Sequence, residues 1–212
     1  MAKLTKGILG GFTGKIGDVV GSSWKGIPVF RRAPSARWPG ISKTQIQQQA
    51  RFILISRFLR PLTELLNQTF KNSAAKMSCF NKAFSVNKDN VTGVYPSFRI
   101  HYPSVLLSSG NLPGTDKAKA SSPKPGRLLV SWNKKITTKP RASGSDTVFL
   151  AAYNEELDKW SYNSGAARRI AGSCNLDLSE FSGREVQTYM GFIGENGKRV
   201  SNSLYLGKVN IL

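Results

Sequence analysis

The sequence is poor in the side chains that build most catalytic and metal sites. It contains one histidine, His101, and two cysteines, Cys79 and Cys174, which lie far apart in the chain. Two cysteines cannot form a disulfide framework, and a zinc site would need several histidines beside them. We interpret both cysteines as small buried hydrophobic residues. No cofactor, no metal site and no small-molecule substrate is predicted.

Acidic residues are scarce as well. The chain has 12 Asp and Glu against 31 Lys and Arg, which gives a formal net charge of +19. Such an excess attracts polyanions, so we expect nucleic acid or an acidic protein surface as the partner. Residues 1–90 hold 15 basic and 3 acidic residues, whereas residues 91–212 hold 16 and 9. The binding surface is therefore expected mainly in the N-terminal part.

Long apolar runs are absent. No segment reaches the roughly 18–20 continuous apolar residues of a membrane-spanning helix. The apolar residues after Lys6 are interrupted by glycines and do not resemble the apolar core of a signal peptide. We expect no membrane span and a cytoplasmic location in the producing cell, with incorporation into a virion or similar particle if the protein is structural.

The first 40 residues are rich in glycine, with seven glycines among the first 26 residues. Short apolar pieces separate these glycines, a pattern that predicts small strands and tight turns. Lys25-Gly26, between Trp24 and Ile27, is predicted to be a hairpin turn.

Residues 43–72 carry apolar side chains mostly three and four positions apart, which predicts a helix with one apolar face. Ser42 and Gln45 match a capping box at its start. Pro61 should kink or divide this helix, because proline removes a hydrogen-bond donor and clashes with the preceding turn. A second helix is predicted over residues 74–86.

Strand-like runs recur at regular spacing in the C-terminal part. They cover residues 128–132, 147–153, 159–162, 174–178, 186–192 and 204–206, and a strong turn, Glu195–Lys198, separates the last two. The spacing favours an antiparallel sandwich. We predict an α+β fold in three parts: a Gly-rich hairpin with two or three helices (1–90), a connecting strand and flexible linker (91–126), and an immunoglobulin- or fibronectin III-like sandwich (127–212).

Three local patterns bear on catalysis, and each favours a structural role. The stretch Gly10–Lys15 resembles a phosphate-binding loop, but its glycine spacing is wrong and Ile16 replaces the required hydroxyl residue. His101 lies in an alternating stretch without a catalytic partner nearby in the sequence. An acidic group at Glu155, Glu156 and Asp158 could form a carboxylate pair, but a solvated turn fits better. We therefore expect a protein that is not an enzyme.

Basic residues near aromatic residues are the best candidates for a polyanion site, because Lys and Arg bind phosphates and Trp stacks on bases. The candidates are Lys15, Lys25, Arg31, Arg32, Arg37 and Trp38, together with a second group in a loop, Lys134, Lys135, Lys139 and Arg141. The alternative is a solvated basic face with Trp24 and Trp38 in the core.

The stretch GILGGFTGKIGDVVGSSWKGIPVFRRAP, followed by SKTQIQQQARF, KMSCFNKAF, VTGVYPSF and SNSLYLG, resembles an uncharacterised domain family common in Bacteroidota. The resemblance covers essentially the whole chain. It implies a fibronectin type III or immunoglobulin-like C-terminal domain and no assigned activity.

Residues 13–60 are also similar to small uncharacterised proteins of phage and prophage genomes, in the Gly-Lys-x-Gly turn, the Lys-Gly hairpin, the Arg-rich strand and the following helix. The usual Asn-Pro before the helix is missing here. Two functions are therefore expected. One is a structural or assembly protein of a phage or related particle, as a homo-oligomer or part of a larger assembly. The other is a cellular protein that binds DNA, RNA or a ribonucleoprotein.

Overall fold

The computed structural model describes residues 3–4, 10–24, 26–34, 40–74, 76–115, 117–134 and 142–212. The chain forms two compact units, Met1–Ile46 and Gln47–Leu212. The division falls earlier than the predicted boundary at residue 90. We call the second unit the body.

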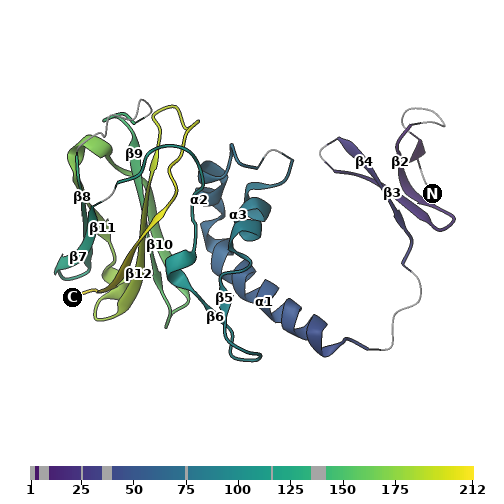
Figure 1. Ribbon diagram of the computed structural model, residues 1–212, viewed down its shortest axis with the longest axis horizontal. Helices are drawn as coiled ribbons and strands as arrows, with labels where there is room; N and C mark the ends of the chain where they lie inside the picture. Colours follow the sequence, from purple (N-terminus) through teal and green to yellow (C-terminus); the bar gives the residue numbers. More distant parts are fainter. Residues whose placement is uncertain are drawn as a thin grey trace. The chain divides into compact units, whose positions relative to one another are not determined.

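The first unit contains an antiparallel sheet, the N-terminal sheet, whose strands follow each other in chain order (Figure 1). These strands are β1 (Lys3–Leu4), β2 (Phe12–Ile16), β3 (Val19–Trp24) and β4 (Ile27–Arg32). Gly17 and Gly26 lie in the turns, with φ of 54° and 80°. Glycine adopts these left-handed conformations without steric cost, so the predicted tight turns are confirmed at these two glycines. The hairpin predicted at Gly26 is confirmed too, while Lys25 lies outside the described residues.

Helix α1 (Lys43–Leu59) begins with the predicted capping box. The Ser42 N–H donates to Gln45 Oε1 at 2.9 Å, and the Gln45 N–H donates to Ser42 Oγ at 3.2 Å. At Pro61 a short 3₁₀ turn, η1 (Arg60–Leu62), separates α1 from α2 (Thr63–Thr69). The predicted division of the helix at Pro61 is therefore confirmed.

The next helix starts later than predicted. Helix α3 covers Cys79–Asn87, whereas the sequence pattern indicated residues 74–86. Ser78 is in an extended conformation, and its Oγ accepts a hydrogen bond from the Asn81 N–H at 3.1 Å. This N-cap satisfies a donor of the first turn and sets the start of the helix at Cys79.

Seven strands of the body form a two-layer antiparallel sandwich. One sheet has the order β11-β8-β7 and the other β10-β9-β12-β13. The strands are β7 (Ala118–Lys124), β8 (Arg127–Trp132), β9 (Thr147–Asn154), β10 (Lys159–Arg168), β11 (Ser173–Asp177), β12 (Glu185–Ile193) and β13 (Leu204–Asn210). The predicted α+β fold with an immunoglobulin- or fibronectin III-like sandwich is confirmed. Strand β7 was not expected, since it lies within the predicted flexible linker.

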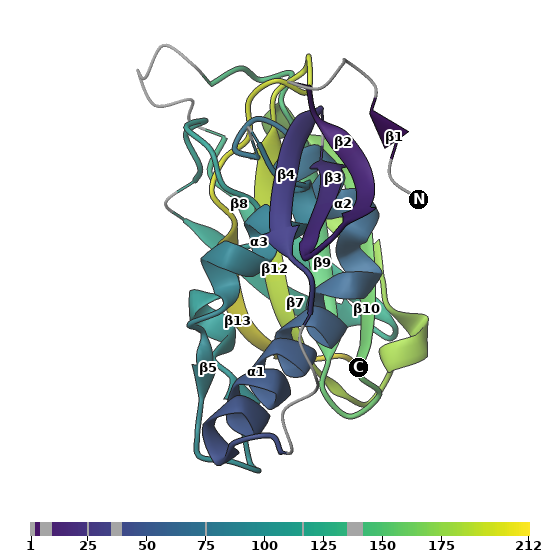
Figure 2. The ribbon, with the colours of Figure 1, turned by 90° about the vertical axis from the view of Figure 1, so that its right-hand side faces the viewer.

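The body has a third layer, which the sequence did not predict. Side chains of β9 alternate between two cores: Leu150 packs toward the three-stranded sheet, and Phe149 packs with the helices. The core that contains Phe149 also contains residues of the helical layer, among them Phe58, Leu62 and Leu66, all at most 2% exposed. In Figure 1 the helices, the four-stranded sheet and the three-stranded sheet follow one another, and Figure 2 shows α2 and α3 in front of the four-stranded sheet.

A segment between α3 and the sandwich is fixed by the side chain of Asn87, which is 1% exposed. Its Nδ2 donates to the carbonyls of Ala83 and Leu106, and its Oδ1 accepts from the Leu106 N–H at 2.8 Å. Between Asn87 and Leu106 the chain forms a small antiparallel hairpin of β5 (Val91–Thr92) and β6 (Arg99–Ile100). Asn87 thus satisfies backbone groups of a segment that runs outside any strand.

Candidate functional site

Two predicted polyanion-binding residues lie on one face of the N-terminal sheet. Lys15, Val20 and Arg31 are direct cross-strand neighbours on β2, β3 and β4. Directly paired residues point to the same face of a sheet, so the two cations flank Val20. Trp24 lies four positions after Val20 on β3, and its partner Ile27 lies four positions before Arg31 on β4. Even spacing along a strand keeps side chains on one face, so both lie on this face as well. We call it the Lys15 face.

The third predicted cation of the sheet points to the opposite side. Arg32 pairs with Val19, which pairs with Ile16. The neighbours Arg31 and Arg32 therefore do not form one cluster, because successive side chains of a strand point to opposite faces. We call the second side the Phe30 face, after its exposed aromatic residue.

On the Phe30 face, two rings meet above a glycine. The ring centroids of Phe12 and Phe30 are 5.1 Å apart. A Cβ atom at Gly21 would lie 2.3 Å from the Phe12 carbonyl oxygen and 2.7 Å from its ring. Only glycine permits this close approach, so Gly21 serves packing rather than a turn.

Both faces of the N-terminal sheet are exposed. Six large apolar side chains are between 41% and 54% exposed: Ile16, Val19, Trp24, Ile27, Val29 and Phe30. Among the described residues up to Ile46, Gly21 alone is buried, and none belongs to either hydrophobic core. The sequence analysis singled out the cations of this sheet and missed these apolar residues. The sequence pattern that could have indicated these residues is the presence of apolar side chains at both odd and even positions of the same strands.

The other predicted site residues are placed only in part. Lys25, Arg37, Trp38, Lys135, Lys139 and Arg141 lie outside the described residues. Lys134 is exposed at the end of the β8 segment, and its side chain lies so close to Gly172 that a Cβ there would be 2.3 Å from Lys134 Cε. Lys15 and Arg31 are therefore the only two of the ten candidates that the described residues show together on one face.

The histidine and the cysteines differ somewhat from their predicted environments. His101 is exposed after β6 rather than within a strand, and its Nδ1 lies 2.7 Å from Ser104 Oγ. Cys79 and Cys174 are free, and each packs against a different core, but both are only half-buried where burial was predicted. Burial nevertheless raises the pKa of the Cys174 thiol.

The acidic group between β9 and β10 is a turn, as predicted, but only part of it is solvated. Glu155 and Glu156 are exposed, whereas Asp158 is half-buried. Asp158 accepts a hydrogen bond from the Tyr153 hydroxyl at 2.7 Å and forms an ion pair with Arg57 of α1. Burial and this hydrogen bond raise the pKa of Tyr153 above its usual value. The Asp158 carboxylate thus joins the turn to the helical layer.

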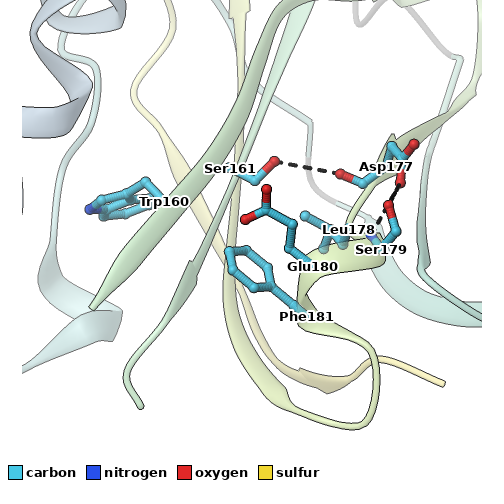
Figure 3. Close-up of a pocket in the computed structure, with 7 residues that line it drawn as sticks. All are labelled: Trp160, Ser161, Asp177, Leu178, Ser179, Glu180 and Phe181. Atoms are coloured by element: carbon cyan, nitrogen blue, oxygen red, sulfur yellow. Dashed lines mark hydrogen bonds between the residues drawn. The ribbon is translucent and has the colours of Figure 1, made fainter. Parts of the chain in front are cut away.

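A polar pocket of about 290 Å³ lies between β10 and the segment after β11 (Figure 3). Its Asp177 carboxylate accepts hydrogen bonds from the hydroxyl and N–H of Ser179, which lower the pKa of Asp177. The second carboxylate, Glu180, lies 3.7 Å from Lys159 Nζ. Both carboxylates therefore have local partners.

The described parts of the chain contain neither a metal-ligand cluster nor a helix suited to span a membrane. Within them, no group of three or more His, Cys, Asp or Glu side chains is placed to hold a metal ion. None of the described helices is both long and apolar enough to cross a membrane.

Fold and surface together define a protein with a fibronectin III-like body and an exposed N-terminal sheet. The chain belongs to a family of unknown function, DUF6266, whose model matches residues 11–207. This confirms the predicted resemblance to an uncharacterised family. Similar solved structures include the fibronectin type III domain of human collagen α-1(XX) chain, at 12% identity and a TM-score of 0.37, covering 49% of this chain and 90% of that one. No curated protein matches the chain.

Proposed function

We propose that this protein is a non-enzymatic structural or assembly protein whose N-terminal sheet binds a neighbouring protein subunit, with the helical and sandwich layers as a rigid body. A phage or related particle is the proposed setting, and this part of the proposal rests only on the sequence resemblance of residues 13–60 to phage proteins described above. We also propose that the family is common in Bacteroidota, as the sequence resemblance implies.

The observation that carries this proposal is the exposure of both faces of the N-terminal sheet. Fully burying a Val, Ile or Phe side chain contributes about 1.5–3 kcal/mol, so covering six half-exposed side chains would contribute several kcal/mol. Three of the six side chains lie on each face of the sheet. Exposed apolar patches on soluble proteins often mark interaction sites. Binding to a neighbouring subunit would supply the cover that the sheet's own described residues do not.

Charge indicates the chemistry of that neighbour. Residues 1–46 contain eight Lys and Arg and one acidic residue, Asp18. A partner with apolar residues surrounded by carboxylates would complement such a surface, because opposite potentials across an interface favour encounter and register. We therefore expect an acidic protein surface as the partner.

Nucleic acid is the second candidate partner, and one specific observation favours it. Lys15 and Arg31 flank Val20 on the face that also carries Trp24, which is 54% exposed. Two cations beside an exposed indole suit a polyanion with bases that can stack. The apolar Phe30 face has no role in this arrangement, which is why assembly is preferred.

The test replaces one apolar residue of the sheet and follows the size of the complex. In lysates of the native host, the tagged chain should sediment as part of a large complex, and Phe30→Ser should sediment as free protein. Val94→Ser, which changes a 79% exposed apolar residue of the body, is the control and should behave like the wild type. Wild-type protein that sediments as free monomer would refute the proposal. A complex that nuclease dissolves and Phe30→Ser leaves intact would favour the nucleic-acid function.

A further inference from the structure

Helix α1 has apolar residues both inside and outside its buried stripe. Ile55, Phe58 and Leu59 are buried against the sheet, at most 2% exposed. Phe52, seven positions before Leu59 and so on the same side of the helix, is 56% exposed, and its ring centroid lies 4.7 Å from that of Phe84. Ile53, about 100° further around the helix, is 62% exposed. A surface helix normally presents polar residues to solvent outside its buried stripe, so the exposed Ile53 next to the exposed Phe52 forms an apolar surface outside the core.

A groove of about 560 Å³ lies at these exposed residues. Phe52 and Ile53 line one part of it, and Arg57, Arg60 and Asp158 line another. A volume of this size accommodates several side chains. The groove thus combines an apolar part with two arginines, and all of its lining lies within the body.

The two arginines differ in their partners. Arg57 forms the ion pair with Asp158 of the same chain. For Arg60, the described residues contain no carboxylate within ion-pair distance. Its guanidinium remains available to an acidic group from outside the chain.

The β9–β10 turn beside the groove has the complementary chemistry. Asp158 belongs to this turn, which also carries the exposed carboxylates Glu155 and Glu156 and the 36% exposed Leu157. Glu156 lies 3.2 Å from Arg184 but keeps 71% of its side chain in solvent. An apolar, basic groove and an acidic, apolar turn therefore lie side by side on one surface.

We infer that this surface binds a second copy of the chain about a two-fold axis. A two-fold interface brings the same patch of both subunits together, so a patch that contains both complementary halves can pair with itself. Leu157 of each copy enters the groove of the other between Phe52 and Ile53, and Glu155 of each copy meets Arg60 of the other. The inference does not depend on the function of the N-terminal sheet.

Light scattering of the purified full chain over a range of concentrations tests the inference. For a patch of this limited size we expect a dimer with a Kd of roughly 10–1,000 µM at about 150 mM salt. Ile53→Glu should raise this Kd at least tenfold. Ile170→Glu is the matched control: Ile170 is 64% exposed but follows the far end of β10, and this variant should dimerise like the wild type.

Charge reversal gives a second readout that does not depend on the apolar contact. Arg60→Glu and Glu155→Arg should each weaken the dimer, and the two changes together should restore a Kd close to that of the wild type. A strictly monomeric wild type would overturn the inference, as would a dimer that Ile53→Glu leaves intact. A dimer that dissociates with Phe30→Ser but not with Ile53→Glu would assign self-association to the N-terminal sheet and overturn it too.

Discussion

Strand β9 and the N-terminal sheet show two outcomes for strands that are apolar on both sides. Phe149 and Leu150 of β9 point in opposite directions, and each is fully buried, one among the helices and the other within the sandwich. Val29 and Phe30 of β4 also point in opposite directions, but they are 41% and 52% exposed. A strand with two apolar faces needs a cover on each, and the chain provides both covers for β9.

This difference teaches where the protein's stability resides and where its binding surface lies. The body has two cores that share one sheet, so its helices and strands should unfold together. The N-terminal sheet has cross-strand pairs and one ring contact but no buried apolar core among its described residues. Its apolar residues remain available to a partner.

The largest expected effect is the loss of a buried ion pair in the body. Arg169, 4% exposed, binds Asp146 at 3.1 Å, donates to the Pro113 carbonyl and lies over the Phe192 ring. Asp146→Asn leaves this guanidinium buried without a counter-charge, which should cost about 3–5 kcal/mol of unfolding free energy in urea titrations. Glu156→Gln, which removes the exposed pair with Arg184, is the control and should cost at most about 1 kcal/mol. Equal losses would mean that the Arg169 pair is not effectively buried.

A somewhat smaller loss is expected in the helical layer. Leu66→Ala creates a cavity between α2 and the four-stranded sheet and should cost about 2–4 kcal/mol. Because α1 and the sheet also share the hydrogen bond from Trp160 Nε1 to the Phe58 carbonyl, both layers should still unfold in one transition. Circular dichroism and tryptophan fluorescence should report the same midpoint. Separate midpoints would show that the helices are not part of the body's cooperative unit.

The smallest expected effect concerns the charges of the N-terminal sheet. If the second candidate function holds, Lys15→Ser with Arg31→Ser should reduce the slope of log affinity against log salt by about 1.8, or about 0.9 for each lost phosphate contact. Lys15→Ser with Arg32→Ser removes the same charge from opposite faces and should reduce the slope by less. Fluorescence anisotropy with single- and double-stranded DNA measures both. Equal slopes would show that the two faces do not differ in nucleic-acid binding.

Much of the fold was predictable from the sequence, and the misses have physical causes. Six strands of the sandwich were expected from their apolar runs, and all six are present. Strand β7 was missed because Ala118–Lys124 is mostly small and polar and contains Pro123, features of an edge strand with little burial. The covering of the sheet by helices was also missed, although the uninterrupted apolar run at 147–153 is typical of a strand buried on both sides.

The candidate site was less predictable. Lys15 and Arg31 are 16 positions apart, and only the register of three strands brings them onto one face. The sequence pattern groups the neighbours Arg31 and Arg32, but the alternation of side chains along β4 places them on opposite faces. The groove at Phe52 and Ile53 depends on the β9–β10 turn, about a hundred residues further along the chain, so local pattern alone could not indicate it.

By itself, the sequence determined the local elements. Several features depend on residues only a few positions apart. They are the helix cap at Ser42, the helix break at Pro61, the turns at Gly17 and Gly26 and the period-two strands. The tertiary structure decided which apolar faces are covered and which charges share a surface. Burial depends on contacts between distant segments, and the same apolar strand can be core or interface according to what packs against it.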